Sequence, residues 1–168
     1  MRIKKTKTAP RGERGSETVE AGLVLVLTFA LMFLLIDLAM SIFVKATLQQ
    51  AVRQGVRFAI TAQNLPSKSY LNDSITATVQ QNALGLLNGT NGACKISINY
   101  FTPAGSAGTA GSGNIVQVAI NGYSFTPLGP VLKSANPVGV SATASDVMEA
   151  CPVAGCPPAV NPVPPTCP

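Results

Sequence analysis

The residues able to do chemistry are few, and their types argue against catalysis. The 168-residue chain contains no histidine, so neither a Ser-His-Asp nor a Cys-His arrangement of the usual kind can form. The commonest general base at neutral pH is therefore missing. The only carboxylates after residue 44 are Asp73, Asp146 and Glu149, and the last two are typical of a solvated surface. We expect no catalytic residues, no enzyme activity and no cofactor.

The four cysteines offer a second kind of chemistry. They are Cys94, Cys151, Cys156 and Cys167, and on the exported side of a membrane they imply disulfides with three possible connectivities. We expect Cys94 to pair with Cys151, and Cys156 with Cys167. A tetrathiolate zinc site is the alternative, but the spacing lacks a Cys-x-x-Cys pair, so we predict no metal site.

A third pattern places a carboxylate, Glu20, at the start of a long apolar stretch. Residues 21–44 contain a single charge, Asp37, and as a helix they would be about 36 Å long, enough to cross a hydrocarbon core of about 30 Å. A buried core helix of this kind would need far more surrounding protein. A cleaved secretory signal would have a shorter apolar core. We therefore predict a transmembrane span at about residues 21–44, called the apolar span below.

The distribution of charge predicts how the chain lies in the membrane. Six of the 12 Lys and Arg residues precede Gly15, whereas Lys45 alone follows the apolar span directly. This asymmetry indicates a basic cytoplasmic leader, residues 1–15, and export of the rest, as a single-pass protein. From Ser16 onward six basic residues balance six acidic ones, so the sequence pI of about 9.2 describes the leader. No nucleic-acid partner is expected.

The helical pattern continues beyond the apolar span, which predicts one long helix within residues 16–62, from about Thr18 to Ala62. One face carries apolar or small residues, and the opposite face carries glutamines and arginines. The first set is Leu48, Ala51, Val52, Gly55, Val56 and Ala59, and the second is Gln49, Gln50, Arg53, Gln54 and Arg57. The small residues Ala51, Gly55 and Ala59 are spaced four apart and would let another helix approach closely. The alternative is that this row packs on the chain's own sheet.

Residues 63–150 predict an exported α+β domain. A second amphipathic helix is expected at residues 67–88, with Leu71, Ile75, Val79, Ala83 and Leu86 or Leu87 facing inward. The period then changes to that of strands at residues 94–101, 115–125 and 138–148. We expect a pilin-like fold with a small antiparallel sheet of three or four strands. The tail, residues 151–168, holds seven of the 13 prolines and is expected to be extended and to bury little.

The start of the long helix resembles the processing site of type IV prepilins, which a membrane aspartic peptidase cuts after the glycine. This resemblance implies cleavage between Gly15 and Ser16. The freed Ser16 ammonium would lie one helical turn from Glu20, and in an assembly Glu20 could pair with the ammonium of a neighbouring subunit. Gly12 and Glu17 form a competing frame, which places the acid three residues farther from the apolar span, so we favour Gly15.

The order of motifs is similar to that of the TadE-like pseudopilins of the tight-adherence (Flp pilus) system. The resemblance covers about residues 14–151, and Ala21 departs from the aromatic residue usual in these proteins. The matching positions are Ala51, Arg53, Gly55, Arg57, Tyr123, Phe125, Pro127, Leu128 and Glu149.

The resemblance implies a structural role. The expected protein is a minor pilin-like subunit of a bacterial tight-adherence type IV pilus or secretion system, located in the inner membrane and matured by a prepilin peptidase. Its expected partners are other pilin or pseudopilin subunits, bound through the N-terminal helix. The alternative is an uncleaved, membrane-anchored binding module that displays the Pro/Cys-rich tail.

Overall fold

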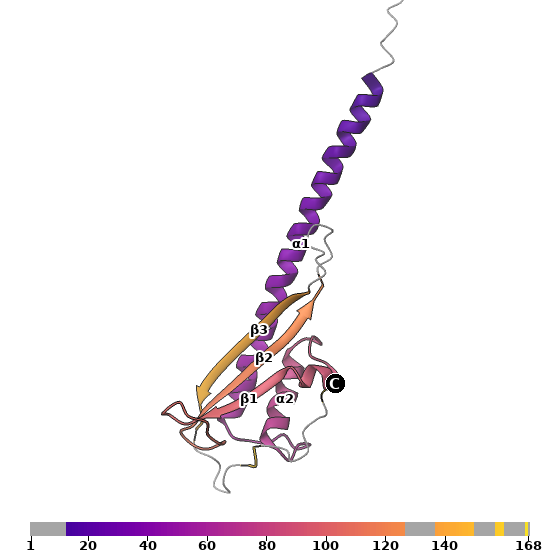
Figure 1. The fold of residues 1–168 in the computed structure, drawn as a ribbon. Coiled ribbons are helices and arrows are strands. Elements are labelled where there is room, and N and C mark those ends of the chain that lie inside the picture. Colours follow the sequence, from indigo (N-terminus) through magenta and orange to yellow (C-terminus); the bar gives the residue numbers. More distant parts are fainter. Residues whose placement is uncertain (1–12, 127–136, 150–156, 160–166, 168) are drawn as a thin grey trace, which may run out of the picture.

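The structure is a computed structural model that describes residues 13–126, 137–149, 157–159 and 167. It consists of a long helix, a shorter helix, a single-turn helix and three strands (Figure 1). These are α1 (Glu13–Ile60), α2 (Leu71–Asn82), α3 (Gly89–Ala93), β1 (Ile96–Phe101), β2 (Ile115–Phe125) and β3 (Val138–Val147). The predicted α+β class, with a long N-terminal helix, a second helix and a small antiparallel sheet, is confirmed.

Helix α1 has two halves in different surroundings. Its 48 residues span about 72 Å at 1.5 Å per residue. The N-terminal half projects from the rest of the described protein, and its large apolar side chains are exposed from Val19 to Phe43 (Figure 1). The C-terminal half, from Val44 onward, packs against α2 and the sheet. This half, with α2, α3 and the three strands, is called the domain below.

The buried face of α1 in the domain follows the predicted helical period. Leu48, Ala51, Val52, Val56 and Ala59 are buried, and Gly55 lies among them. Of the polar residues predicted on the opposite face, all are exposed except the half-buried Gln54. The helix begins at Glu13 and ends at Ile60, slightly earlier at both ends than the sequence predicts.

Helix α2 is shorter than the predicted segment, although its buried face is the predicted one. Leu71, Ile75, Val79 and Ala83 are buried, as is Leu87 in the turn that follows. The helix stops at Asn82 because the chain enters left-handed backbone conformation at Leu84 and then Gly85, with φ of 49° and 84°. Residues 83–88 form turns that lead into α3, which the sequence pattern does not predict.

The sheet has the order β1-β2-β3, and both pairings are antiparallel. Val116, Val118 and Ile120 of β2 are fully buried because alternate side chains of the central strand point toward α1 and α2. The β2–β3 register shifts between Ile120 and Tyr123, where Gly122 takes a φ of 69°. The sheet thus covers the flank of α1 with one face and leaves the other face outward.

Candidate functional site

The predicted cleavage bond lies at the N-terminal end of α1, directly before the apolar span and away from the domain. Gly15 and Ser16 are both helical, and the Thr18 Oγ1 hydroxyl donates a hydrogen bond to the Gly15 carbonyl oxygen at 2.9 Å. A Cβ atom placed on Gly15 would have no atom within 4 Å outside its own helix backbone. Gly12, the competing glycine, lies outside the described residues.

Glu20 lies one turn further along α1, on an exposed strip of the helix. Glu17, Ala21, Val24 and Thr28 share this strip, since they follow one another at helical spacing. Within the described part of the chain no cation forms an ion pair with Glu20. The carboxylate is therefore open to a charge supplied by another molecule or by a newly formed N-terminus.

The apolar span has the character of a surface that faces an apolar environment. Among the described residues one helix, Gly15–Ile60, is long and apolar enough to cross a membrane. Asp37 contrasts with its exposed neighbours, because it is only 3% exposed. The Ser41 Oγ hydroxyl donates to the Asp37 carbonyl oxygen at 2.9 Å, which satisfies the hydroxyl inside the span.

The row of small residues on α1 is used inside the domain. Ala51 and Ala59 are fully buried, and a Cβ atom on Gly55 would collide with Cγ2 of Val79 on α2. The same position lies 3.8 Å from Cγ1 of Val118 on β2. Within the described residues, α2 and the chain's own sheet thus both approach α1 at Gly55.

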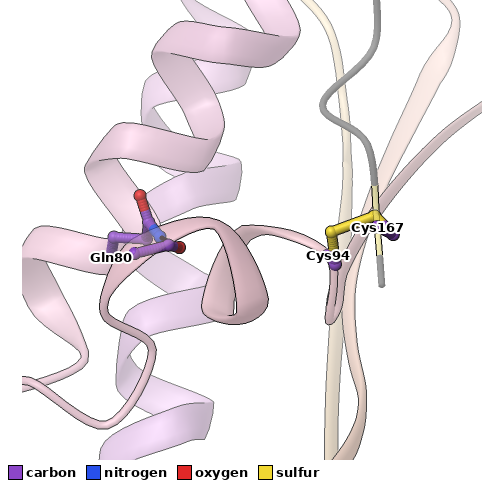
Figure 2. The surroundings of a disulfide bond; sticks show 4 residues. Gln80, Cys94 and Cys167 are labelled. Carbon is purple, nitrogen blue, oxygen red and sulfur yellow. Dashed lines mark hydrogen bonds between the residues drawn. A yellow bond between two sulfur atoms is a disulfide. The ribbon is translucent and has the colours of Figure 1, made fainter.

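The disulfide of the described structure joins Cys94 to Cys167, with 5.7 Å between their Cα atoms (Figure 2). The predicted pairings, Cys94 with Cys151 and Cys156 with Cys167, are therefore wrong. The bond also removes two of the four thiols that a tetrathiolate zinc site would need. Cys151 and Cys156 lie outside the described residues.

The path of the tail gives the physical reason for this pairing. The backbone N–H groups of Leu71 and Asn72 donate to the carbonyl oxygens of Pro158 and Ala159, each at 3.0 Å. These N–H groups open α2 and have no partner within the helix, and Tyr70 provides no side-chain cap. Ala159 also packs against the core. Residues 158 and 159 of the tail thus dock on α2, ahead of Cys167 in the chain.

Helix α3 is held at both of its ends near this disulfide. Gln80 Nε2 donates to the carbonyl oxygens of Leu87 and Gly89, at 2.7 and 2.9 Å, where the chain enters α3. Cys94 is the C-cap residue of the same helix. Figure 2 shows Gln80 and the disulfide on opposite sides of this turn. The disulfide therefore joins the tail to the C-terminal end of α3.

Two features of the domain surface were not recognised from the sequence. The docking of Pro158 and Ala159 uses backbone carbonyls, which carry no residue-type signal. Arg53 and Arg57 line a groove between α1 and β3. Their i, i+4 spacing on the polar face of α1 is evident in the sequence, but the groove is not.

Among the residues that the structure describes, no three His, Cys, Asp or Glu side chains converge as metal ligands would.

The comparisons with known proteins agree with the N-terminal part of this description. Residues 15–57 match the family model described as TadE-like protein. No curated protein and no solved structure matches the chain significantly. The match begins at Gly15 and runs through the apolar span into the buried face of α1. The resemblance to the TadE-like family is thereby confirmed for the long helix, residues 15–57, of this chain.

Proposed function

We propose that the chain is a minor pilin-like subunit, a pseudopilin, of a bacterial tight-adherence type IV pilus or secretion system. A prepilin peptidase matures it by cutting between Gly15 and Ser16, and its role in assembly is structural rather than enzymatic. It resides in the inner membrane as a single-pass protein, with the leader in the cytoplasm and the domain on the exported side.

The observation that carries this proposal is the match of residues 15–57 to the TadE-like family model. The match indicates involvement in the assembly of a tight-adherence pilus. The surroundings of α1 support the role of a pilin-like subunit. Its N-terminal part is apolar and exposed, so it can contact lipid or neighbouring helices, whereas its C-terminal part is packed inside the domain. The small residues Ala51, Gly55 and Ala59 are buried inside the domain, so the contacts between subunits are made by the apolar span.

Glu20 gives the proposed contact its register. A carboxylate near the membrane boundary costs free energy, less than at the midplane, and an ammonium close to it offsets that cost. Cleavage would create such an ammonium on Ser16, and in an assembly the ammonium of an adjacent subunit can occupy the same place. Glu20→Gln keeps the shape and removes the charge. It should leave cleavage intact while weakening crosslinks to other pilus subunits.

The decisive experiment is N-terminal sequencing of the protein purified from its native membrane. The wild type should begin at Ser16, and Gly15→Val should accumulate with residues 1–15 attached. Gly22→Val is the matched control, because neither glycine has any atom near its Cβ position. It adds the same side chain to the same helix and should still be cleaved. A wild-type protein that keeps its leader would overturn the proposed maturation.

An uncleaved product would favour the second candidate, a membrane-anchored binding module that displays its tail. The docking of Pro158 and Ala159 on α2 and the bond of Cys167 to Cys94 weigh against that candidate. Both hold tail residues against the domain instead of leaving them free to extend toward a ligand.

A further inference from the structure

Strand β3 forms an edge of the sheet. Among the described residues it pairs with β2 on one side and with no strand on the other. Met148, directly after β3, exchanges hydrogen bonds with Asn114 and Gly113 at 2.8 and 3.0 Å, so its backbone faces β2. Backbone direction alternates along a strand, and therefore Thr143 and Ser145 direct their N–H and C=O groups to the open side.

The edge of β3 lacks two of the residue types by which proteins protect such strands. Its ten residues, VGVSATASDV, contain no proline and no lysine, and the one charge, Asp146, is next to last. Asp146 Oδ1 accepts a hydrogen bond from the Val147 N–H at 2.8 Å, which directs this carboxylate to its own backbone. A long edge with a single charge near its end is a template for an additional strand.

A groove of about 460 Å³ runs beside β3, between the strand and α1. The helix contributes the exposed Arg53 and Arg57, and the strand contributes Ala144, Ser145 and Asp146. No carboxylate of the described residues forms an ion pair with either arginine. The groove therefore presents two guanidinium groups and one carboxylate, that of Asp146, to whatever occupies it. Each guanidinium can bind a carboxylate of a partner through two parallel hydrogen bonds.

The spacing of the two arginines matches the repeat of a strand. Residues four apart on a helix are separated by about 6 Å along its axis. Side chains two apart on one face of a strand are separated by about 6.7 Å. Helix α1 and strand β3 run alongside each other in Figure 1. A strand added to β3 would thus bring alternate side chains past Arg53 and Arg57 in turn.

We infer that the edge of β3 binds an extended segment of a partner protein that carries acidic residues at alternate positions, in the pattern acid-x-acid. The partner's backbone pairs with the open side of β3, and its two carboxylates meet Arg53 and Arg57. A second copy of this chain does not fit, because no two of its seven acidic residues lie two apart in the sequence. The partner is therefore a different protein.

A labelled peptide tests this inference directly. The probe is Thr-Val-Asp-Val-Asp-Val-Thr, and its binding to the full-length protein in detergent micelles is followed by fluorescence anisotropy at low salt. The matched peptide with Asn in place of both Asp residues keeps size and strand propensity, and it should bind at least tenfold more weakly. A third peptide, N-methylated on alternate residues of its pairing edge, should not bind, since it cannot donate to β3.

Variants of the protein locate the site. The double variant Arg53→Gln, Arg57→Gln should reduce binding of the Asp peptide to the level of the Asn peptide. Lys68→Gln removes one exposed cation outside the groove and should have little effect. Circular dichroism checks that all variants keep their helix content, as expected for exposed positions.

Several results would overturn the inference: no binding of the Asp peptide at millimolar concentration, equal binding of the Asp and Asn peptides, full binding of the N-methylated peptide, or full binding to the arginine variant. The outcome is separable from the proposed function, because peptide binding requires neither cleavage nor assembly. Gly15→Val, which tests maturation, should bind the peptide as the wild type does.

Discussion

At the scale of single residues, Tyr100 shows how burial and one hydrogen bond shape the domain. Its side chain is 8% exposed, and its hydroxyl donates to Asn72 Oδ1 at 2.7 Å, which ties β1 to α2. Burial raises the pKa of Tyr100 from its ordinary value of 10.0 to about 12. The neutral phenol is therefore the form that the folded domain favours.

This pKa shift predicts an alkaline loss of stability. Below pH 10 both states keep the proton and the stabilisation is complete. Between pH 10 and about 12 the unfolded chain releases the proton first, so the free energy of unfolding falls by about 1.4 kcal/mol per pH unit. Tyr100→Phe should cost about 1 kcal/mol at pH 7, through the lost hydrogen bond, and should flatten this fall.

Urea unfolding at a series of pH values checks the prediction, with circular dichroism as the signal. An alkaline slope that is equal in the wild type and in Tyr100→Phe would contradict the assignment to Tyr100.

Gly55 is a residue at which α1 and α2 approach each other closely. In Gly55→Ala the new methyl group would collide with Cγ2 of Val79, whose branched side chain has little rotational freedom in a helix. Overpacking of this kind costs about 1–3 kcal/mol, against a gain of about 1 kcal/mol in helix propensity. Gly22→Ala makes the same change in the same helix with no neighbour nearby, so it should be neutral or stabilising. Thermal unfolding in detergent compares the two variants, and equal midpoints would refute the close approach.

At the scale of elements, the sequence predicts faces better than ends. The apolar periods on α1 and α2 fix which side chains are buried, because the helix repeat leaves one solution for each face. The end of α2 could not be predicted, since Leu84 adopts a positive φ that its residue type does not suggest. The cysteine pairing could not be derived either, because it depends on where the tail docks. The tail docks through the backbone carbonyls of Pro158 and Ala159, which carry no residue-type signal.

The start of α2 is capped from outside by the tail, and this cap should contribute to stability. Deleting residues 150–168 leaves the N–H groups of Leu71 and Asn72 without their protein acceptors. With disulfides reduced in both proteins, the truncated chain should lose about 1–2 kcal/mol relative to the full chain. Tyrosine fluorescence in a urea titration is a suitable signal, because the chain contains no tryptophan. An unchanged midpoint would show that solvent caps α2 equally well.

At the scale of the whole molecule, one covalent bond ties the end of the chain to the middle of the domain. The Cys94–Cys167 disulfide joins residues 73 apart, and closing a loop of that length in the unfolded chain is worth about 4 kcal/mol by chain entropy. The double variant Cys94→Ala, Cys167→Ala should therefore lose about 2–4 kcal/mol under oxidising conditions.

Adding a reductant distinguishes the stabilisation by the Cys94–Cys167 disulfide from that by any bond between the remaining cysteines. Dithiothreitol should bring the wild type down to the stability of the double variant. Any further decrease that it causes in the double variant measures Cys151 and Cys156 alone. A double variant as stable as the oxidised wild type would rule out this disulfide as a stabilising element.

Because α1 is one continuous helix, the direction in which the domain faces around the helix axis is fixed relative to the faces of the apolar span. The face of α1 that packs in the hydrophobic core begins at Val44, where the apolar span ends. No proline lies between Glu20 and Ile60 to interrupt the helix. Each residue inserted into the span would turn the domain by about 100° about the helix axis. One extra alanine after Phe29 therefore misaligns the domain and the membrane helix. Seven extra alanines make nearly two full turns and restore the alignment to within about 20°. If subunits dock through both halves at once, crosslinking to partners should fail with one inserted alanine and return with seven.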